Sequence, residues 1–221
     1  MKILALGDCN TFGNVDYENN SFPERFAKKM NAHIKNCGYT MSTTREMKYF
    51  AEENIDEADI VLIQYGLVDS WKTFKYAPYI LYYPDNKLRK LYRKIVKKYK
   101  KIAKKLTLNS LLGTENVVPE QEYKDNIEQL ILKYPNKKFI LIDTIPNKEL
   151  SRNHEIIKYN FILEQLSILY SNCYYVKIYD LFLEKFDEYY LDNTHINNKG
   201  YDVIALELFK KIKTIYKNLN I

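Results

Sequence analysis

Cysteine is scarce in this chain of 221 residues, and its distribution excludes two kinds of site. Cys9, Cys37 and Cys173 are odd in number and far apart, so they make no disulfide framework and match no zinc-ligand spacing. We therefore expect reduced thiols, no bound metal and no cofactor. Cys37 and Cys173 lie in strand-like runs, where cysteine usually serves as a small buried apolar residue.

Long apolar runs are absent as well. None approaches the roughly 18 residues that a membrane span needs, and Met1-Lys2 leads into the first strand without a charged and then apolar leader. We therefore expect a cytoplasmic protein. No internal repeat or low-complexity linker divides the sequence, and a chain of 221 residues is long enough for one α/β domain with a full core. The prediction is a single domain over residues 1–221.

Acidic residues are missing from one long segment. Residues 87–105 hold eleven Lys or Arg and no Asp or Glu, so without them the net charge of +6 would become −5. Apolar residues recur there every three or four positions, which predicts an amphipathic helix over 87–106. Its apolar stripe consists of Leu88, Leu91, Ile95, Tyr99, Ile102 and Leu106.

Two interpretations of this basic helix remain open. In one, the apolar stripe packs on the protein and the basic face is merely solvated. In the other, the helix attracts an anionic glycan or lies on the inner-membrane surface. Nucleic acid is disfavoured, because no recognition fold or base-stacking module accompanies the charge.

Strand-like and helical patterns alternate along the rest of the chain. This alternation predicts a doubly wound three-layer α/β/α sandwich with a five-stranded parallel sheet, flavodoxin-like in type. About seventy residues separate the third and fourth strands, far more than a crossover needs, so residues 70–118 are expected to form a lid or wall beside the site. The expected strands span 2–7, 33–38, 60–64, 139–143 and 174–179, and the expected helices 22–30, 44–53, 87–106, 121–133, 154–170 and 197–216. Residues 10–20 are expected to be a polar turn.

Two short motifs at opposite ends of the chain carry possible chemistry. Gly7-Asp8-Cys9 ends the first apolar run, as a buried strand does when it presents a nucleophile at a turn. Asp192-x-x-His195 precedes the last helix and supplies a base with an acid to orient it. A cysteine attacks only as thiolate, so it needs such a base or a cationic neighbour near neutral pH.

These motifs resemble those of the SGNH (GDSL-type) esterase and acyltransferase family. Gly7-Asp8-Cys9-Asn10-Thr11 looks like its first block with cysteine in place of serine, and Asp192-Asn193-Thr194-His195 looks like its last. Gly66-Leu67-Val68-Asp69 occupies the place of the Gly-x-Asn-Asp block, with Val68 at the asparagine. The resemblance covers the whole chain and implies the SGNH hydrolase type of sandwich.

The resemblance also implies roles for individual residues. Cys9 would be the nucleophile, His195 the general base and Asp192 its orienting acid. The backbone N–H of Cys9 and that of Thr40 or Met41 would form the oxyanion hole, while Val68 cannot donate the hydrogen bond that the family's asparagine gives. The expected substrate-binding residues are Asp8, Asn10, Gly66, Val68 and Asp69.

The function implied is acyl transfer, by an esterase or acyltransferase. Such families often act on acylated glycans, so we expect a small-molecule or glycan acyl substrate, for example a carbohydrate or activated sugar in surface-polysaccharide biosynthesis. A thioester at Cys9 would favour transfer, above all to amines, over hydrolysis. The alternative is a catalytically inactive module of the same fold that binds a glycan or a membrane surface.

Overall fold

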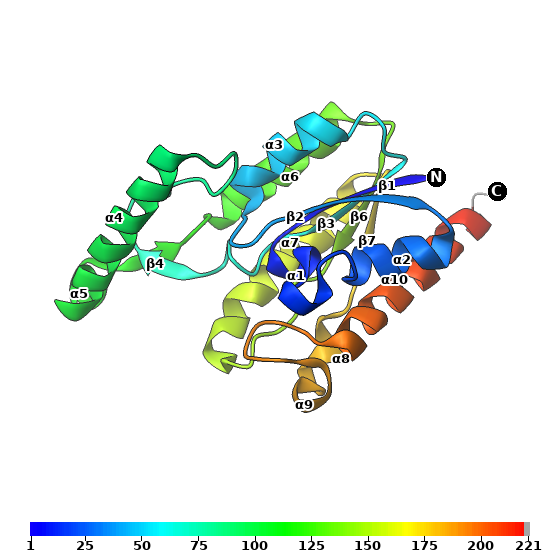
Figure 1. Cartoon of the computed structure of the whole chain (residues 1–221). Coiled ribbons are helices and arrows are strands. Elements are labelled where there is room, and N and C mark those ends of the chain that lie inside the picture. The colour runs from blue at the N-terminus through cyan, green and yellow to red at the C-terminus, as the bar shows by residue number, and fades with distance from the viewer. Residues whose placement is uncertain (219–221) are drawn as a thin grey trace.

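The centre of the molecule is a five-stranded parallel sheet, seen in the computed structural model, which describes residues 1–218 (Figure 1). Its strand order is β2-β1-β3-β6-β7, and every neighbouring pair runs parallel. The strands are β1 (Lys2–Gly7), β2 (His33–Gly38), β3 (Ile60–Gln64), β6 (Lys138–Ile142) and β7 (Cys173–Val176). The predicted five-stranded parallel sheet is confirmed.

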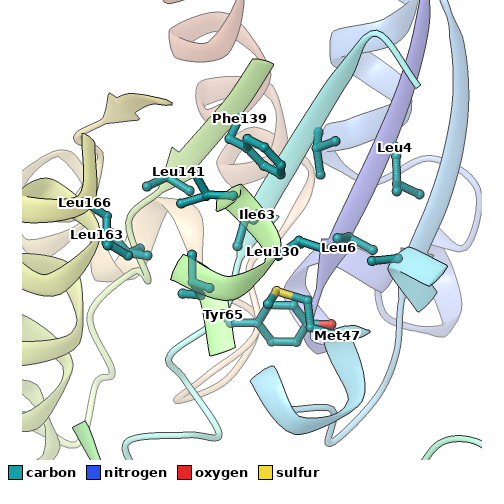
Figure 2. Close-up of a cluster of buried hydrophobic side chains, with 14 of the residues drawn as sticks. Leu4, Leu6, Met47, Ile63, Tyr65, Leu130, Phe139, Leu141, Leu163 and Leu166 are labelled. Atoms are coloured by element: carbon teal, nitrogen blue, oxygen red, sulfur yellow. The ribbon is translucent and has the colours of Figure 1, made fainter. Parts of the chain in front are cut away.

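Helices cover both faces of this sheet. On one face lie α3 (Thr44–Asn54), α6 (Glu120–Lys133) and α7 (Asn153–Leu169), and on the other α2 (Phe22–Met30) and α10 (Asn198–Asn218). Figure 2 shows the first interface, where the strand residues Leu4, Leu6 and Ile63 lie among side chains of the covering helices. The expected three-layer α/β/α class is therefore confirmed.

The sequence of the central strands explains why they lie in the middle. Leu4 and Leu6 of β1 belong to the core on the α3 side, whereas Ile3 and Ala5 belong to the core on the α10 side. Successive side chains of a strand point to opposite faces. A strand covered on both faces is therefore nearly continuously apolar, as β3 is: all five of its residues are buried, and only Gln64 at its end is polar.

A local capping motif sets the start of α3. The Thr43 hydroxyl accepts a hydrogen bond from the Arg45 N–H, and the Glu46 carboxylate accepts one from the Thr43 N–H at 2.9 Å. This reciprocal arrangement satisfies N–H groups that the first helical turn leaves unpaired. The helix predicted over 44–53 is confirmed and ends one residue later.

The strand order reverses direction between β1 and β3. The chain leaves β1 toward β2 on one side of the sheet and then crosses back to β3 on the other. Parallel sheets bind ligands at the carboxyl ends of the strands at such a point. Cys9 lies just beyond the end of β1 and Val68 just beyond the end of β3.

Two expected local structures differ in the molecule. The turn expected over 10–20 begins with a short helix, α1 (Cys9–Phe12), because the Asp8 carboxylate caps it by accepting the Asn10 N–H at 3.0 Å. A 3-10 turn, Val15–Tyr17, follows it. The strand expected over 174–179 ends at Val176, because Asp143 accepts the N–H groups of Ile178 and Tyr179. Those bonds turn the chain into α8 (Tyr179–Leu183), which α9 (Phe186–Tyr189) follows.

The insertion enters and leaves the sandwich at one place. A small antiparallel hairpin of β4 (Lys72–Phe74) and β5 (Thr114–Asn116) forms its base. The Val118 N–H donates to the Asp69 carbonyl at 3.1 Å, and the Val117 N–H to the Trp71 carbonyl at 2.8 Å. Beyond this hairpin stand α4 (Lys87–Lys105) and α5 (Leu108–Leu112), off the sandwich beside α3 in Figure 1.

Helix α4 ends one residue before the predicted 87–106. Of the two open interpretations of this helix, packing of the apolar stripe on the protein does not hold for Leu88, Leu91 and Ile95, which are 58%, 53% and 54% exposed. Ala103 alone is fully buried. Among residues 1–218, no helix is both long enough and apolar enough to cross a bilayer.

Tyrosines of the insertion contact α3. The Tyr79 hydroxyl donates to Glu46 at 2.9 Å. Tyr83 stacks on Phe50 with ring centroids 4.0 Å apart. These contacts hold the first half of the insertion close to the carboxyl end of β2.

Candidate active site

Cys9 lies half-buried at the start of α1, against Leu67, Ile156 and Tyr179. This burial raises the pKa of its thiol well above the usual value, and the nearby Asp8 carboxylate raises it further. The N–H groups of Cys9 and Asn10 act in the opposite direction but do not offset burial. The resting form of Cys9 is therefore the thiol, which needs a base to become a nucleophile.

Two buried carboxyl groups, Asp8 and Asp69, lie near each other, and Asp8 directly precedes Cys9. Asp69 accepts hydrogen bonds from the N–H and the hydroxyl of Thr44, at 2.9 and 2.8 Å, and its second oxygen has no partner. Burial raises the pKa of each carboxyl to about 7, and the Asp69 charge adds to the rise at Asp8. Both were expected to bind substrate. In the structure Asp8 caps α1 and Asp69 ties its loop to α3, and substrate binding by either residue stays a prediction.

His195 and Asp192 form a close pair on the loop before α10. His195 Nδ1 lies 2.7 Å from Asp192 Oδ2, and Asp192 Oδ1 accepts the N–H groups of Thr194 and His195. Burial raises the pKa of Asp192, but the hydrogen bonds from His195 and the backbone outweigh it and leave the pKa below its usual value. An ionised Asp192 holds the proton on Nδ1, which leaves Nε2 as the basic nitrogen.

Asn10 joins the cysteine and histidine segments. Its side-chain amide donates to the Thr194 carbonyl at 3.2 Å, and the Asn147 amide donates to the Thr194 hydroxyl at 3.1 Å. The structure therefore brings the neighbours of Cys9 and His195 into contact. Within residues 1–218, no hydrogen bond joins the Cys9 thiol to His195. Free enzymes often have long catalytic contacts that tighten when substrate binds.

The backbone N–H groups of Cys9, Thr40 and Met41, the predicted oxyanion donors, donate to no backbone carbonyl among the described residues. Met41 has φ of +65°, a left-handed conformation that glycine adopts with less strain. The side chain of Val68 is 2% exposed and cannot donate, so the possible oxyanion donors are backbone groups.

Gly66 shapes the turn after β3. Its φ is +134°, and a Cβ atom there would lie 2.5 Å from the Thr144 hydroxyl, which donates to the Tyr65 carbonyl at 2.9 Å. Gly66 therefore permits a close approach between the ends of β3 and β6. This conformation explains why glycine is present, and its role in substrate binding stays a prediction.

Sequence reasoning missed two parts of this region. Asn147 follows β6 in a loop without a recognisable motif, and only its position at the carboxyl end of a strand could have indicated it. The second omission is a cavity of about 820 Å³ between α4 and the sandwich, lined by Met41 and Val68 and by basic side chains of α4. The sequence predicts the basic helix, but not that some of its basic side chains line this cavity.

Solved structures share this architecture. A lipase/acylhydrolase from Enterococcus faecalis superimposes with a TM-score of 0.67 at 16% identity, covering 96% of this chain and 95% of that one. A variant of an acetyl-xylooligosaccharide esterase from Geobacillus stearothermophilus has a TM-score of 0.66 at 18% identity, with coverages of 96% and 93%. This chain has the GDSL-type hydrolase fold.

A lipolytic protein of the G-D-S-L family from Desulfitobacterium hafniense shares the GDSL-type fold too, with a TM-score of 0.64 at 16% identity and coverages of 95% and 98%. No protein-family model and no curated protein sequence matches this chain. The likeness lies in the fold, over nearly the full length of each neighbour, and these neighbours act on esters according to their descriptions.

Proposed function

We propose that this protein is an acyl-transfer enzyme, an esterase or acyltransferase, with Cys9 as nucleophile, His195 as general base and Asp192 as orienting acid. The observation that supports it best is the 2.7 Å pair of His195 and Asp192 on a loop that Asn10, the residue after Cys9, contacts directly. The neighbours of the same fold are described as esterases and acylhydrolases, which supports the same class of reaction.

The reaction proceeds in two steps, acylation of Cys9 and transfer of the acyl group to an acceptor. His195 Nε2 takes the proton of the Cys9 thiol while sulfur attacks the acyl carbonyl carbon, and the N–H groups of Cys9 and Met41 stabilise the oxyanion. The protonated His195 then gives its proton to the departing alcohol, which leaves a thioester on Cys9. An incoming acceptor, deprotonated by His195, takes the acyl group and restores the thiol. Water or an amine can serve as acceptor, and a thioester favours the amine.

The proposed substrate is an acylated carbohydrate or an activated sugar used in surface-polysaccharide biosynthesis. One neighbour of the same fold is described as an acetyl-xylooligosaccharide esterase, which supports a glycan substrate. Trp71, Tyr79 and Tyr82 line the cavity beside Val68 and offer ring faces on which a sugar can stack.

The test of the enzyme is covalent trapping. Wild-type protein incubated with p-nitrophenyl acetate should gain the mass of one acetyl group on Cys9 and release p-nitrophenol. Cys9→Ala should lose the adduct, and His195→Ala should slow its formation by about 10²-fold or more. Cys37→Ala is the matched control, because Cys37 is also buried but lies on β2, away from the His195 loop.

A non-catalytic binding module on the same fold is the second candidate. The raised pKa of the Cys9 thiol and the lack of a donor at Val68 favour it. Absence of any adduct on Cys9 in the trapping experiment, with glycan binding retained, would establish this alternative. Release of free acid alone in the presence of amine and hydroxyl acceptors would establish a hydrolase.

The proposed location is the cytoplasm at the inner-membrane surface, with α4 as the contact. The apolar stripe that α4 exposes is bordered by Lys98 and Lys105, and such a helix can insert its apolar face while lysines bind anionic headgroups. Cosedimentation with phosphatidylglycerol vesicles should be lost in a Leu91→Ser, Ile95→Ser variant. Equal binding of both proteins would leave the stripe without this role.

A further inference from the structure

Part of the basic side of α4 lines a cavity. The apolar residues Leu88, Leu91 and Ile95 of the same helix point away from it and are exposed. Lys94 and Lys97 line the cavity and remain open to solvent, whereas Lys100 is half-buried there. Apolar side chains normally point to the protein, so an outward apolar stripe with lysines gathered at one hollow indicates that these lysines bind a ligand in it.

The cavity has the dimensions and lining of a small-molecule site. Its volume of about 820 Å³ lies within the range of roughly 300–1,000 Å³ that such sites occupy. Aromatic and aliphatic side chains cover its wall on the sandwich side, and no carboxylate lines it. The cations that line it are Lys72, Lys90, Arg93, Lys94, Lys97 and Lys100.

Half of these cations lack an opposite charge. Lys90 and Arg93 share Asp85, at 3.4 and 2.6 Å, and Lys72 pairs with Glu155 at 3.2 Å. Lys94, Lys97 and Lys100 have no ion pair within residues 1–218. Burial lowers the pKa of Lys100, with no carboxylate to offset it. Three unpaired ammonium groups in one hollow repel each other and are stabilised by an anion between them.

The spacing of these lysines limits the shape of the anion. Positions 94, 97 and 100 lie on one side of the helix, and six residues of helix extend about 9 Å. An anion that contacts all three must carry more than one negative group along that length. Trp71 and Tyr82 on the cavity wall leave room for an apolar or ring-shaped part.

We propose that this cavity binds a phosphate- or diphosphate-bearing small molecule, with its phosphates on Lys94, Lys97 and Lys100 and its organic part against the aromatic wall. Met41 and Val68 line the same cavity and belong to the candidate active site, so a bound molecule can extend to Cys9. The binding of this ligand does not depend on the proposed function. Its role as acyl donor or acceptor does.

The experiment is calorimetric titration of the full chain with inorganic pyrophosphate, with uridine diphosphate and with short-chain phosphatidic acid below its micelle concentration. The cavity variant is Lys94→Gln, Lys97→Gln, Lys100→Gln. The matched control is Lys98→Gln, Lys101→Gln, Lys105→Gln, which removes the same charge from exposed positions outside the cavity lining on the same helix. Circular dichroism and urea unfolding should show both variants folded.

The cavity variant should bind about 10- to 100-fold more weakly than wild type, and the control should differ less than about threefold. Binding of pyrophosphate or uridine diphosphate identifies a soluble phosphorylated ligand, and binding of phosphatidic acid alone identifies a lipid headgroup. Equal weakening in both variants, or no binding of any probe, would overturn the proposal. Cys9→Ala should bind the probes as wild type does. A failure of the proposed catalysis can therefore be distinguished from a failure of ligand binding.

Discussion

Replacing Asp8 by asparagine should make the protein more stable at pH 8 while changing little at pH 4. Asp8 is 2% exposed, and burial raises the pKa of its carboxyl from 3.8 to about 7, with a further rise from the Asp69 charge. The folded protein therefore holds a proton on Asp8 where the unfolded chain has released it. Because the folded pKa is the higher one, stability is fully present below pH 3.8 and falls as pH rises toward 7.

The size of the effect follows from the two pKa values. Each pKa unit corresponds to about 1.4 kcal/mol, so a rise of about three units costs roughly 4 kcal/mol above pH 7. Between pH 5 and pH 8 the part that changes is roughly 2–3 kcal/mol. Asparagine keeps the oxygen that accepts the Asn10 N–H and is an equally good helix cap. The substitution thus removes the titration and preserves the contact.

Urea unfolding at pH 5 and pH 8 measures this difference. The gain of Asp8→Asn over wild type should be larger at pH 8 by roughly 2–3 kcal/mol, whereas Asp187→Asn, at an exposed position, should show no such trend. The Cys9 thiol of Asp8→Asn should also react faster with iodoacetamide at pH 8, because the Asp8 charge raises its pKa. A gain that is the same at both pH values refutes the buried ionisation.

Three further substitutions test other parts of the structure. Met41→Gly should raise the free energy of unfolding by about 0.5–1 kcal/mol, because Met41 has φ of +65°; a loss in urea unfolding would contradict the strain. Glu155→Gln should destabilise the protein by about 1–3 kcal/mol at pH 7. Burial raises the pKa of Glu155, but hydrogen bonds from Asn116 and Lys72 outweigh it and lower the pKa to about 2. The loss of stability should therefore shrink as pH falls from 4.5 toward 2, and a loss that stays constant would exclude the ion pair. Val68→Asn should raise the rate with p-nitrophenyl acetate by up to about 10²-fold, since it supplies an oxyanion donor, and Val68→Ala should not; no increase would place position 68 outside the oxyanion hole.

The sheet was predictable because each central strand is a short apolar run. The bounds of β1, β2 and β3 agree with the expected ones. For β1 and β3 the reason is burial on both faces, which favours a near-continuous apolar run, whereas β2 is an edge strand with polar positions. The hairpin of β4 and β5 was not predicted. Its strands have three residues each and lie forty positions apart, and its register is set by distant contacts such as Asn116 with Glu155.

The candidate site was predictable only in part. Motif residues such as His195 and Asp192 are three positions apart, so their pairing follows from local geometry. The contact of Asn10 with Thr194 spans 184 positions and depends on the whole fold. Likewise, the periodicity of the sequence predicts that α4 has an apolar and a basic face. Which of the two faces packs on the protein depends on the segments before and after the helix, and periodicity does not describe them.

The narrow base of the insertion makes it removable. Lys75 and Gly113 are joined backbone to backbone at 3.4 Å, so residues 76–112 leave and return at nearly the same point. A tight turn of two to five residues could close the hairpin there, and shortening a loop costs little or favours closure. The insertion is therefore a separable module, because no strand of the five-stranded sheet belongs to it. Moved to another protein of this fold, it would carry the charged cavity wall with it.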